Sequence, residues 1–294
     1  MNLTRIYRQI VPEKIRKSLY KAFVKQLLDI SDFIKYKGYY LFFSVFTPKT
    51  EKNECNYFLG KYSIVNYPYP YYFEYMKKDI KCYTDLEKNL PYVIHNNRKL
   101  YFKKMSEARV LEAYKMLLME QDLRSAHCYV DNYETLKGKT ILDVGAAEGI
   151  FSLNAIDFVD HIYLFECEKD WIEPLRATFE PVKDKITIVE KYVSDTSDGE
   201  MITLDNFFGT KIPDNLFVKM DIEGFERKAL KGCENLFLNG RNISGAICTY
   251  HRDDDEKVIT SILKSRKSNV TKTNGYIYNE RSLRTGVVRF QPLI

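Results

Sequence analysis

A short glycine-framed turn holds the first residues whose types and spacing could do chemistry. In the stretch TILDVGAAEGIFSL, a hydrophobic run ends at Asp143, and Gly145 and Gly149 enclose a turn that leads into a helix. Glycine lets the backbone approach a ligand where a side chain would collide, so we expect Ala146 and Glu148, between the two glycines, to border that ligand. The spacing is G-x-x-x-G rather than the G-x-G-x-x-G of pyrophosphate-binding loops. Since the Asp143 carboxylate would repel a phosphate, the turn suits a cationic group such as an amino acid's ammonium.

A second carboxylate, Glu166, ends the next hydrophobic run, YLFE, and Cys167 follows it. A carboxylate at that strand end can accept hydrogen bonds from both hydroxyls of a ribose. After the third run, Asp195 could accept the adenine amino group, with Val193 or Ser194 against the ring. A ligand with a ribose, an amino-acid end and no phosphate is S-adenosylmethionine, which we predict as the cofactor.

Two further segments bring polar side chains to the same edge of a sheet. FVKMDIEGFE places Lys219, Asp221 and Glu223 at the end of a fourth strand, and SGAICTYHRDDDE places His251 at the end of a fifth. The carboxyl ends of the strands form the ligand crevice of an open α/β sheet. Methyl transfer from a sulfonium needs an aligned, deprotonated nucleophile. We predict these four residues as the catalytic group, with His251 as the base and Asp221 orienting it or taking the proton itself.

A bound divalent cation is the rival account of the same edge. Asp221, Glu223, His251 and one acid from 253–255 could supply oxygen and nitrogen ligands. Those three aspartates also suit an acidic helix start, which the helix dipole favours. We therefore assign no metal site.

The stretch MEQDLRSAHCYV precedes the glycine turn and could close over the methionine end of the cofactor. Gln121 and His127 are its candidate cofactor contacts. The motif D/N-P-P-Y/F, which would cradle a planar amide or an exocyclic amine, does not follow the fourth strand. Oxygen is therefore a better acceptor candidate than an amide or base nitrogen.

The elements that must position these residues begin near Lys137. Five short apolar runs, TILDVG, HIYLFE, KITIVEKYV, LFVKMDIE and ISGAICTYH, alternate with helix-compatible stretches, which predicts buried strands in a doubly wound α/β sheet. Upstream, residues 92–104 resemble a hairpin that turns at Asn96-Asn97, and 106–122 are typical of an amphipathic helix. We place a methyltransferase domain at 131–294 and a helical, aromatic-rich region, for acceptor binding or association, at 1–130.

Residues from about 115 to 290 resemble the FkbM family of S-adenosylmethionine-dependent methyltransferases. The resemblance rests on ILDVGAAEGIFSL, LFECEKDW, ITLDNFF, FVKMDIEGFERKAL and ICTYHRDDDE, of which the K-x-D-I-E-G-x-E signature is the specific one. It implies a Rossmann-like class I methyltransferase fold, a mostly parallel sheet of seven strands with the last antiparallel. It also implies methyl transfer, usually to oxygen.

Composition and charge limit the partners of this 294-residue chain. The formal net charge of +5 lies within the first 30 residues, which hold seven Lys or Arg and two Asp or Glu. The rest of the chain sums to zero, which argues against nucleic acid. Residues 13–30 have apolar side chains at helical spacing and basic ones between them, so this helix either docks on its own domain or contacts an anionic membrane or a partner. Six scattered cysteines, no apolar run of membrane-spanning length and no recognisable signal peptide predict a cytoplasmic protein, with possible peripheral contact at the inner membrane face.

The function that these residues favour is O-methylation of a sugar, a glycan or another small-molecule hydroxyl. The alternative is a non-catalytic module of similar fold that binds a nucleoside or a partner; the presence of Asp221 and His251 argues against it. A nucleotide-dependent oxidoreductase lacks its phosphate-cradling loop. An RNA methyltransferase would need basic charge on the catalytic domain.

Overall fold

The computed structural model describes residues 26, 27, 29–43 and 48–293, and the chain divides into two compact units, Met1–Tyr69 and Pro70–Ile294. The helix expected at 13–30 lies mostly outside the described residues. Its described members, 26, 27, 29 and 30, are helical, and the helix continues to residue 38. Within the described residues, no helix combines the length and the hydropathy that a membrane crossing requires.

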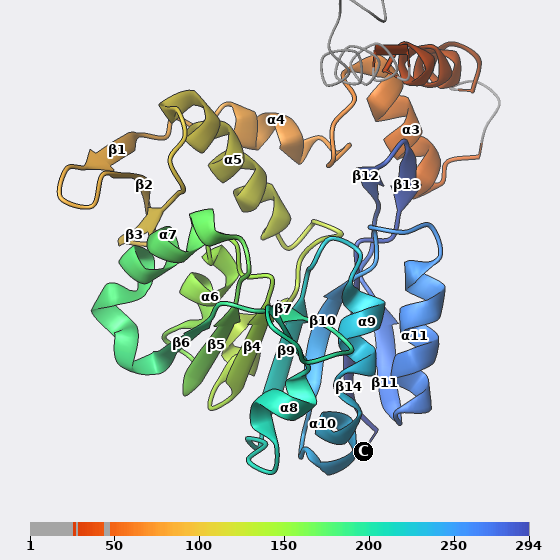
Figure 1. Cartoon of the computed structure of the whole chain (residues 1–294). Helices are drawn as coiled ribbons and strands as arrows, with labels where there is room; N and C mark the ends of the chain where they lie inside the picture. The colour runs from red at the N-terminus through yellow and green to blue at the C-terminus, as the bar shows by residue number, and fades with distance from the viewer. Residues whose placement is uncertain (1–25, 28, 44–47, 294) are drawn as a thin grey trace, which may run out of the picture. The chain divides into compact units, whose positions relative to one another are not determined.

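A seven-stranded sheet forms the centre of the second unit (Figure 1). Its strands, in chain order, are β4 (Thr140–Val144), β5 (His161–Phe165), β6 (Ile186–Val189), β9 (Leu216–Met220), β10 (Ser244–Cys248), β11 (Ser268–Lys272) and β14 (Val287–Pro292). Their spatial order is β11-β14-β10-β9-β4-β5-β6. Within this sheet β14 alone runs antiparallel, against both β10 and β11. The last strand is therefore the reversed one, which confirms the predicted Rossmann-like class I fold.

Helices cover both faces of this sheet, so the strands are apolar on both sides. On one face the side chains of Ile141, Ile162 and Phe217 pack beneath three helices and a 3-10 turn. On the other, Leu142 and Val218 pack beneath four helices. The first set is α5 (Glu107–Glu120), α6 (Ile150–Ala155), α7 (Lys169–Phe179) and η2 (Tyr133–Leu136); the second is α8 (Leu204–Phe208), α9 (Glu226–Lys231), α10 (Glu234–Asn239) and α11 (Asp255–Ser265).

Smaller elements complete the second unit. They are α4 (Tyr71–Met76), the antiparallel sheet β1 (Cys82–Asp85), β2 (Leu90–His95) and β3 (Arg98–Tyr101), the 3-10 turn η3 (Glu180–Lys185), and the pairs β7 (Tyr192–Val193) with β8 (Met201–Ile202) and β12 (Ile277–Asn279) with β13 (Ser282–Arg284). The predicted hairpin is confirmed: β2 and β3 join at Asn96 and Asn97, both with positive φ, as a tight two-residue turn requires. The run KITIVEKYV is not one strand, because β6 ends at Val189 and Tyr192–Val193 pair with β8 instead.

The division between the compact units differs from the boundary expected at 130/131, because it falls after Tyr69. The reason is a shared core. Val93 and Leu100 from the small sheet, and Val110 from α5, are fully buried in the same cluster as the β4 and β5 side chains. Residues 70–130 therefore fold as part of the unit that carries the glycine turn.

The regular elements of the first unit, in its described part, are helices. The helix through residue 38 runs into a π-helical turn, η1 (Tyr39–Phe43), and is followed by α3 (Glu51–Lys61). The Thr50 hydroxyl caps α3 by accepting a hydrogen bond from the Asn53 backbone N–H, at 3.3 Å. Buried Tyr36, Phe58 and Leu59 supply its apolar packing.

Candidate active site

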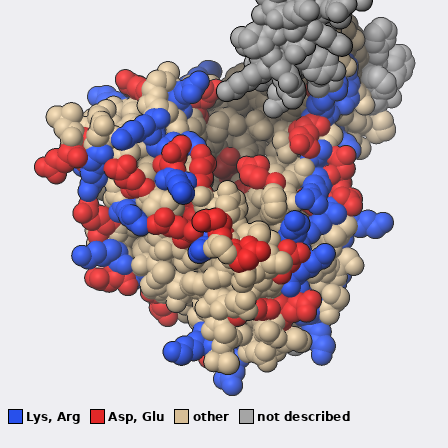
Figure 2. All heavy atoms as spheres, viewed as in Figure 1, with Lys and Arg blue, Asp and Glu red and all other residues tan. Residues whose placement is uncertain are grey.

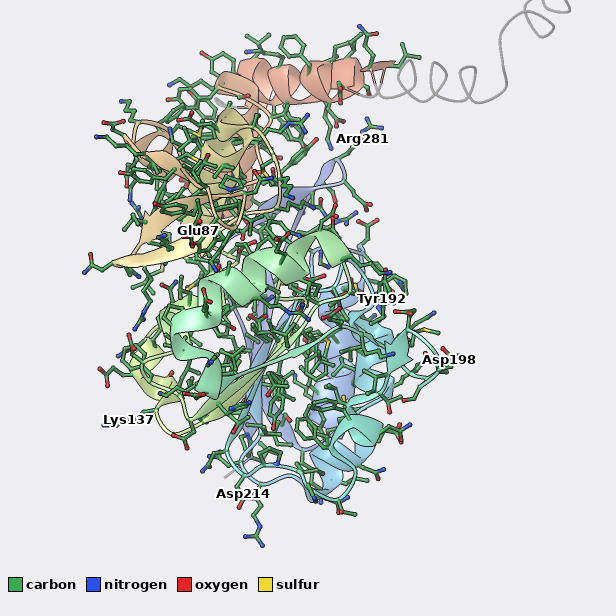
Figure 3. The ribbon with its side chains drawn as sticks, turned by 60° about the vertical axis from the view of Figure 1, so that its left-hand side comes forward. Glu87, Lys137, Tyr192, Asp198, Asp214 and Arg281 are labelled. Atoms are coloured by element: carbon green, nitrogen blue, oxygen red, sulfur yellow. The ribbon has the colours of Figure 1, made fainter. Side chains whose placement is uncertain are left out.

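A cavity of about 630 Å³ opens at the carboxyl ends of β4, β5 and β9. Its lining combines backbone from the glycine turn, side chains after β5, the β7–β8 pair and the loop after β9. The lining residues are Val144, Gly145, Ala147, Phe165, Glu166, Cys167, Glu168, Trp171, Lys191, Tyr192, Val193, Ser194, Glu200, Met201, Asp221, Ile222, Glu223 and Phe225. In Figure 3, Tyr192 lies toward this end of the sheet, and Lys137 and Asp214 lie at the opposite end, where β4 and β9 begin.

Two glycines let the backbone pass through this narrow place. Gly145 has φ 79°, and a Cβ there would lie 1.9 Å from the carbonyl oxygen of Asp221. Gly149 has φ 82° and caps α6, and a Cβ there would lie 2.7 Å from the Phe179 ring. Any other residue would push the turn away from the loop after β9 or from α7, so the G-x-x-x-G spacing fixes the path of the turn, and Gly145 lines the cavity.

Asp143 is closed off from the cavity rather than open to it. Its side chain is fully buried, with Oδ1 2.9 Å from Lys219 Nζ and Oδ2 accepting a hydrogen bond from the Ser152 hydroxyl at 2.6 Å. Lys219 also donates to the carbonyl oxygen of Gly145. Burial alone would lower the pKa of Lys219, but the charges of Asp143 and Asp221 raise it above its usual range. The pair therefore braces the glycine turn from behind, and neither residue is among those that line the cavity.

Glu166 is the carboxylate that the cavity exposes from the β4–β5 side. Its Oε2 accepts the backbone N–H of Ala147 at 2.8 Å, and its Oε1 accepts those of Cys167 and Glu168 at 2.8 and 2.7 Å. These three bonds hold the carboxylate rigid. A carboxylate offers about four acceptor positions, so roughly one, on Oε2, is left for a ligand hydroxyl. We predicted that Glu166 accepts hydrogen bonds from both ribose hydroxyls, but backbone N–H groups already occupy most of its acceptor positions.

Of the three residues between the two glycines, one lines the cavity and two are buried. Ala147, with φ 47°, lines the cavity, whereas Ala146 is buried in the core beneath it. Glu148 is also buried, and this burial, together with the charge of Glu120, raises its pKa to about 8. Cys167, which we predicted as a cofactor contact, lines the cavity.

Asp221 follows β9 and joins the cavity to a cluster of polar side chains behind it. Its Oδ2 accepts a hydrogen bond from the Tyr129 hydroxyl at 2.9 Å and lies 3.3 Å from His127 Nε2. The Tyr250 hydroxyl lies 3.3 Å from Oδ1. Burial works to raise the pKa of Asp221, but the hydrogen bond and charge of His127 and the charge of Lys219 hold it well below its usual range. Asp221 is therefore an ionised acceptor at neutral pH.

His251 lies three residues beyond β10 and is held by an acid that we did not predict to act on it. Its Nδ1 is 2.9 Å from Oε1 of Glu226, which is completely buried. Its Nε2 lies 3.5 Å from Asp221 Oδ1 and 3.6 Å from Glu223 Oε2. Burial would lower the pKa of His251, but the contact with Glu226 and the charges of Asp221 and Glu223 raise it above its usual value. A carboxylate at Nδ1 leaves Nε2 as the nitrogen that can exchange a proton.

The loop between β9 and α9 is organised by the same Glu226. Its Oε1 accepts the backbone N–H groups of Ile222 at 2.9 Å and Gly224 at 3.4 Å. These bonds stabilise a bend in which Glu223 has φ 54° and Gly224 has φ 88°. A non-glycine residue in that region is strained, and such strain is commonly found at functional sites. The bend turns the Glu223 carboxylate outward, where its side chain is 91% exposed.

The remaining predicted contacts lie away from the cavity. Asp195 is exposed, its carboxylate accepts the Ser194 hydroxyl at 3.2 Å, and Ser194 and Val193, rather than Asp195, line the wall. Gln121 accepts a hydrogen bond from the Tyr133 hydroxyl at 2.9 Å. His127 contacts Asp221 but is not among the described residues that line the cavity.

Two sets of three side chains in the described residues bring possible metal ligands within 4.8 Å of one another. They are His127, Asp221 and Cys248, and Asp221, Glu226 and His251. The acids at 253–255 considered for this role are engaged elsewhere, because Asp253 pairs with Arg284 at 2.7 Å and the two that follow pair with Arg227.

Several side chains at the site escaped sequence reasoning. Tyr129 and Tyr250 flank residues that we had singled out, and Glu226 is the last member of the K-x-D-I-E-G-x-E signature. Their positions in those motifs are the signal that was available. Trp171 and Phe225, which line the cavity, carry no such signal, because an isolated aromatic residue is usually part of a core.

The cavity is electrically negative. Five of its lining residues are acidic, Glu166, Glu168, Glu200, Asp221 and Glu223, against one lysine, Lys191. Figure 2 shows acidic side chains gathered near the middle of the viewed face, with lysines and arginines mainly around them. A negative, partly apolar cavity favours a cationic ligand over a phosphate-bearing one.

Comparison with known proteins gives likenesses of fold only. No protein-family model and no curated protein matches the chain. Among solved structures, the methyltransferase FkbM from Methylobacillus flagellatus KT is 20% identical over 62% of this chain and 52% of its own, with a TM-score of 0.41. This chain thus spans about half the length of that relative.

Two further solved structures are similar at lower identity. The fibrillarin pre-rRNA processing protein of Methanococcus jannaschii is 12% identical over 74% of this chain and 98% of its own, with a TM-score of 0.42. Magnesium protoporphyrin IX methyltransferase from Synechocystis PCC 6803, solved with bound S-adenosylmethionine, is 12% identical over 65% of this chain and 86% of its own, with a TM-score of 0.40.

Proposed function

We propose that this chain is an S-adenosylmethionine-dependent methyltransferase that methylates a hydroxyl oxygen of a sugar, a glycan or another small molecule. The observation that carries the proposal is the combination of two features at one sheet edge. Glu166, rigidly held by three backbone N–H groups, faces the cavity from β5. Asp221 lines the same cavity from β9, with His251 and Glu226 directly behind it.

The residues present suit the cofactor. The free acceptor position of Glu166 would take one ribose hydroxyl, and Cys167, Val193 and Ser194 would border the adenine. The space that a Cβ at Gly145 would fill lets the turn approach the methionine end closely. The negative lining favours a ligand that carries positive charge and no phosphate. When bound, the cofactor supplies a methyl group on a sulfonium, whose sulfur keeps the bonding electrons after transfer.

The chain's own part in the reaction is to place the acceptor and remove its proton. His251 Nε2 takes the proton from the acceptor hydroxyl as the oxygen bonds to the methyl carbon. Glu226 holds the ring through Nδ1 and stabilises the imidazolium that forms. Asp221, 3.5 Å from Nε2, orients the imidazole from the other side. The expected role of His251 is thus kept, and most of the orienting role passes to Glu226.

Acceptor chemistry is suggested by the outer part of the cavity. Tyr192 and Phe225 are each about half exposed at its lining, and such rings can stack on the C–H face of a sugar. The acids around them disfavour a phosphate-rich acceptor such as RNA. Residues 70–130 share the core of this unit, so their proposed help in acceptor binding would come from the same folded body.

A two-step experiment tests the proposal. Calorimetric titration with S-adenosylmethionine, with a nicotinamide dinucleotide as the matched control, should show binding of the first and not of the second. Transfer of a labelled methyl group to neutral oligosaccharides should then exceed transfer to RNA. Binding of the dinucleotide in place of S-adenosylmethionine would overturn the cofactor, and binding without transfer to any hydroxyl acceptor would favour the non-catalytic alternative.

Chelation separates the base from the metal account. Because His251 acts here as a proton acceptor, turnover should be unchanged after exhaustive treatment with a chelator. Loss of turnover that returns with a divalent cation would instead assign Asp221, Glu226 and His251 to a metal ion.

A further inference from the structure

A stripe of aliphatic side chains lies uncovered along the first described helix. Leu27, Ile30, Ile34 and Leu41 are each between 50% and 65% exposed. The spacings of three and four residues place Leu27, Ile30 and Ile34 on one face of the α-helix, and Leu41 follows in the π-helical turn η1. Hydrophobic residues scattered singly on a surface need no explanation, but neighbouring ones on one helix form a patch that favours an apolar partner.

The opposite face of the same helix is the one that packs within the first unit. Asp32 and Tyr36 are buried, and a Cβ on Gly60 of α3 would lie 2.0 Å from the Tyr36 carbonyl oxygen. Two residues along a helix correspond to a rotation of about 200°. The side chains of Ile30 and Ile34, each two residues from a buried one, therefore point away from α3. The exposed aliphatic stripe therefore lies on the side of the helix opposite the one that packs against α3.

The charged and aromatic residues near the stripe indicate what kind of partner would contact it. Lys37 lies 5.6 Å from the Phe33 ring and 5.7 Å from that of Tyr40, so cation and aromatics share one end of the helix. In the sequence, the first 30 residues hold the entire formal excess of +5, and their seven Lys and Arg all lie between residues 5 and 25, ahead of the described part of the helix. Lysine, aromatic and aliphatic side chains on one helix are typical of segments that lie in the interface of an anionic bilayer.

We propose that the face formed by Leu27, Ile30, Ile34 and Leu41 rests on an anionic lipid surface. The helix would lie in the plane of the interface, with these side chains in the acyl boundary and the basic side chains at the headgroups. The proposal extends the expected contact at 13–30 to described residues further along the helix. It is independent of methyl transfer, since its residues all belong to the first unit.

Vesicle sedimentation of the full-length protein tests this proposal. Wild-type protein should pellet with vesicles that contain phosphatidylcholine and phosphatidylglycerol, and less with phosphatidylcholine alone or at high salt. The double variant Ile30→Glu/Ile34→Glu should lower the partition coefficient by roughly tenfold or more, since it removes two aliphatic side chains that would be buried in the bilayer. Leu238→Glu is the matched control, because Leu238 is 79% exposed on α10 of the second unit, and it should behave as wild type.

Far-UV circular dichroism and thermal unfolding of both variants show that they remain folded, and these readouts do not depend on the proposed function. Equal pelleting of wild type and double variant would overturn the proposal, as would wild-type protein that stays in the supernatant with anionic vesicles. Should the wild type instead be a dimer that the double variant dissociates, without vesicle binding, the face joins two copies of this chain and the lipid assignment fails.

Discussion

Two buried acid–base pairs stand at neighbouring strand ends of the same sheet, and they differ in what lies beside them. Asp143 and Lys219 are enclosed between β4 and β9, with the Ser152 hydroxyl and the Gly145 carbonyl as their further partners. Glu226 and His251 are also buried, but Nε2 of the imidazole faces Asp221 at the wall of the cavity. The first pair is enclosed by these partners. In the second pair, Nε2 of His251 is buried too, but it lies 3.5 Å from Asp221 and 3.6 Å from Glu223, two acids that line the cavity.

This difference helps to tell charged residues that stabilise the fold from charged residues that could take part in a reaction. Both pairs are buried, and each contains one residue with a raised pKa, Lys219 in the first and His251 in the second, so neither property identifies a residue that takes part in a reaction. What distinguishes them is their neighbours, because the imidazole of the second pair lies beside two acids that line the cavity, Asp221 and Glu223. Removal of a partner should therefore damage folding at the first pair and turnover at the second.

The largest expected effect is on stability at Asp143. Asp143→Ala leaves the Lys219 ammonium buried without its carboxylate, which should lower the free energy of unfolding by about 3–5 kcal/mol. Urea unfolding measures the loss. The double variant Asp143→Leu/Lys219→Met removes both charges and should recover much of it. A single variant within about 1 kcal/mol of wild type would show that the pair is open to solvent or ligand, contrary to its enclosure.

The next largest effect is on turnover at His251. His251→Ala should lower kcat by roughly a hundredfold or more, since the proton acceptor is lost, and leave affinity for S-adenosylmethionine within about twofold, because His251 is not among the cavity-lining residues. Steady-state kinetics and calorimetry check the two halves. His161→Ala is the matched control, because His161 lies at the start of β5 and contacts Thr187. A His251 variant that keeps near-normal turnover would place the base elsewhere.

The sequence predicted the strands and the turn at this sheet edge. It did not predict which charged residues there pair with each other. Runs of apolar residues and two glycines are local signals, and they predicted β4, β5, β9 and the turn. Asp143 is enclosed because of the register of β4 against β9, in which Asp143 and Lys219 are direct partners. Hydrophobic pattern leaves such a cross-strand register open when both strands are apolar on both faces.

The role of Glu226 was hidden for a similar reason. As the first residue of α9 it suits a helix start, and nothing in the chain nearby indicates that His251, after another strand, will meet it. The boundary at 130/131 differed from the observed division because side chains such as Val93 and Leu100 pack into a core that forms only when the sheet is assembled. Non-local packing of this kind decides where a unit ends, and local composition does not report it.

A smaller effect is expected on cofactor affinity at Glu166. Glu166→Gln keeps the shape but turns one oxygen into a donor, which opposes the backbone N–H groups that the carboxylate now accepts. Affinity for S-adenosylmethionine should fall roughly tenfold, in line with the loss of charged hydrogen bonds. The control variant Glu190→Gln, which alters an exposed ion pair with Arg176, should leave the affinity for S-adenosylmethionine unchanged in calorimetric titration. Equal affinities in the two variants would remove Glu166 from the binding site.

The smallest and sharpest effect concerns the pH dependence of turnover through Glu226. Because the proposed base must be neutral, kcat/KM should fall as pH drops through the raised pKa of His251. Glu226→Gln removes the carboxylate at Nδ1, so this pKa should fall and the acid limb should move to lower pH, by about one unit. Glu223→Gln is the control: its carboxylate is 91% exposed and 3.6 Å from Nε2, so solvent screening should leave a smaller shift in the same direction. An acid limb that stays in place with Glu226→Gln would mean that the enclosed carboxylate supports the loop of Glu223 and Gly224 alone, and the second pair would then be structural like the first.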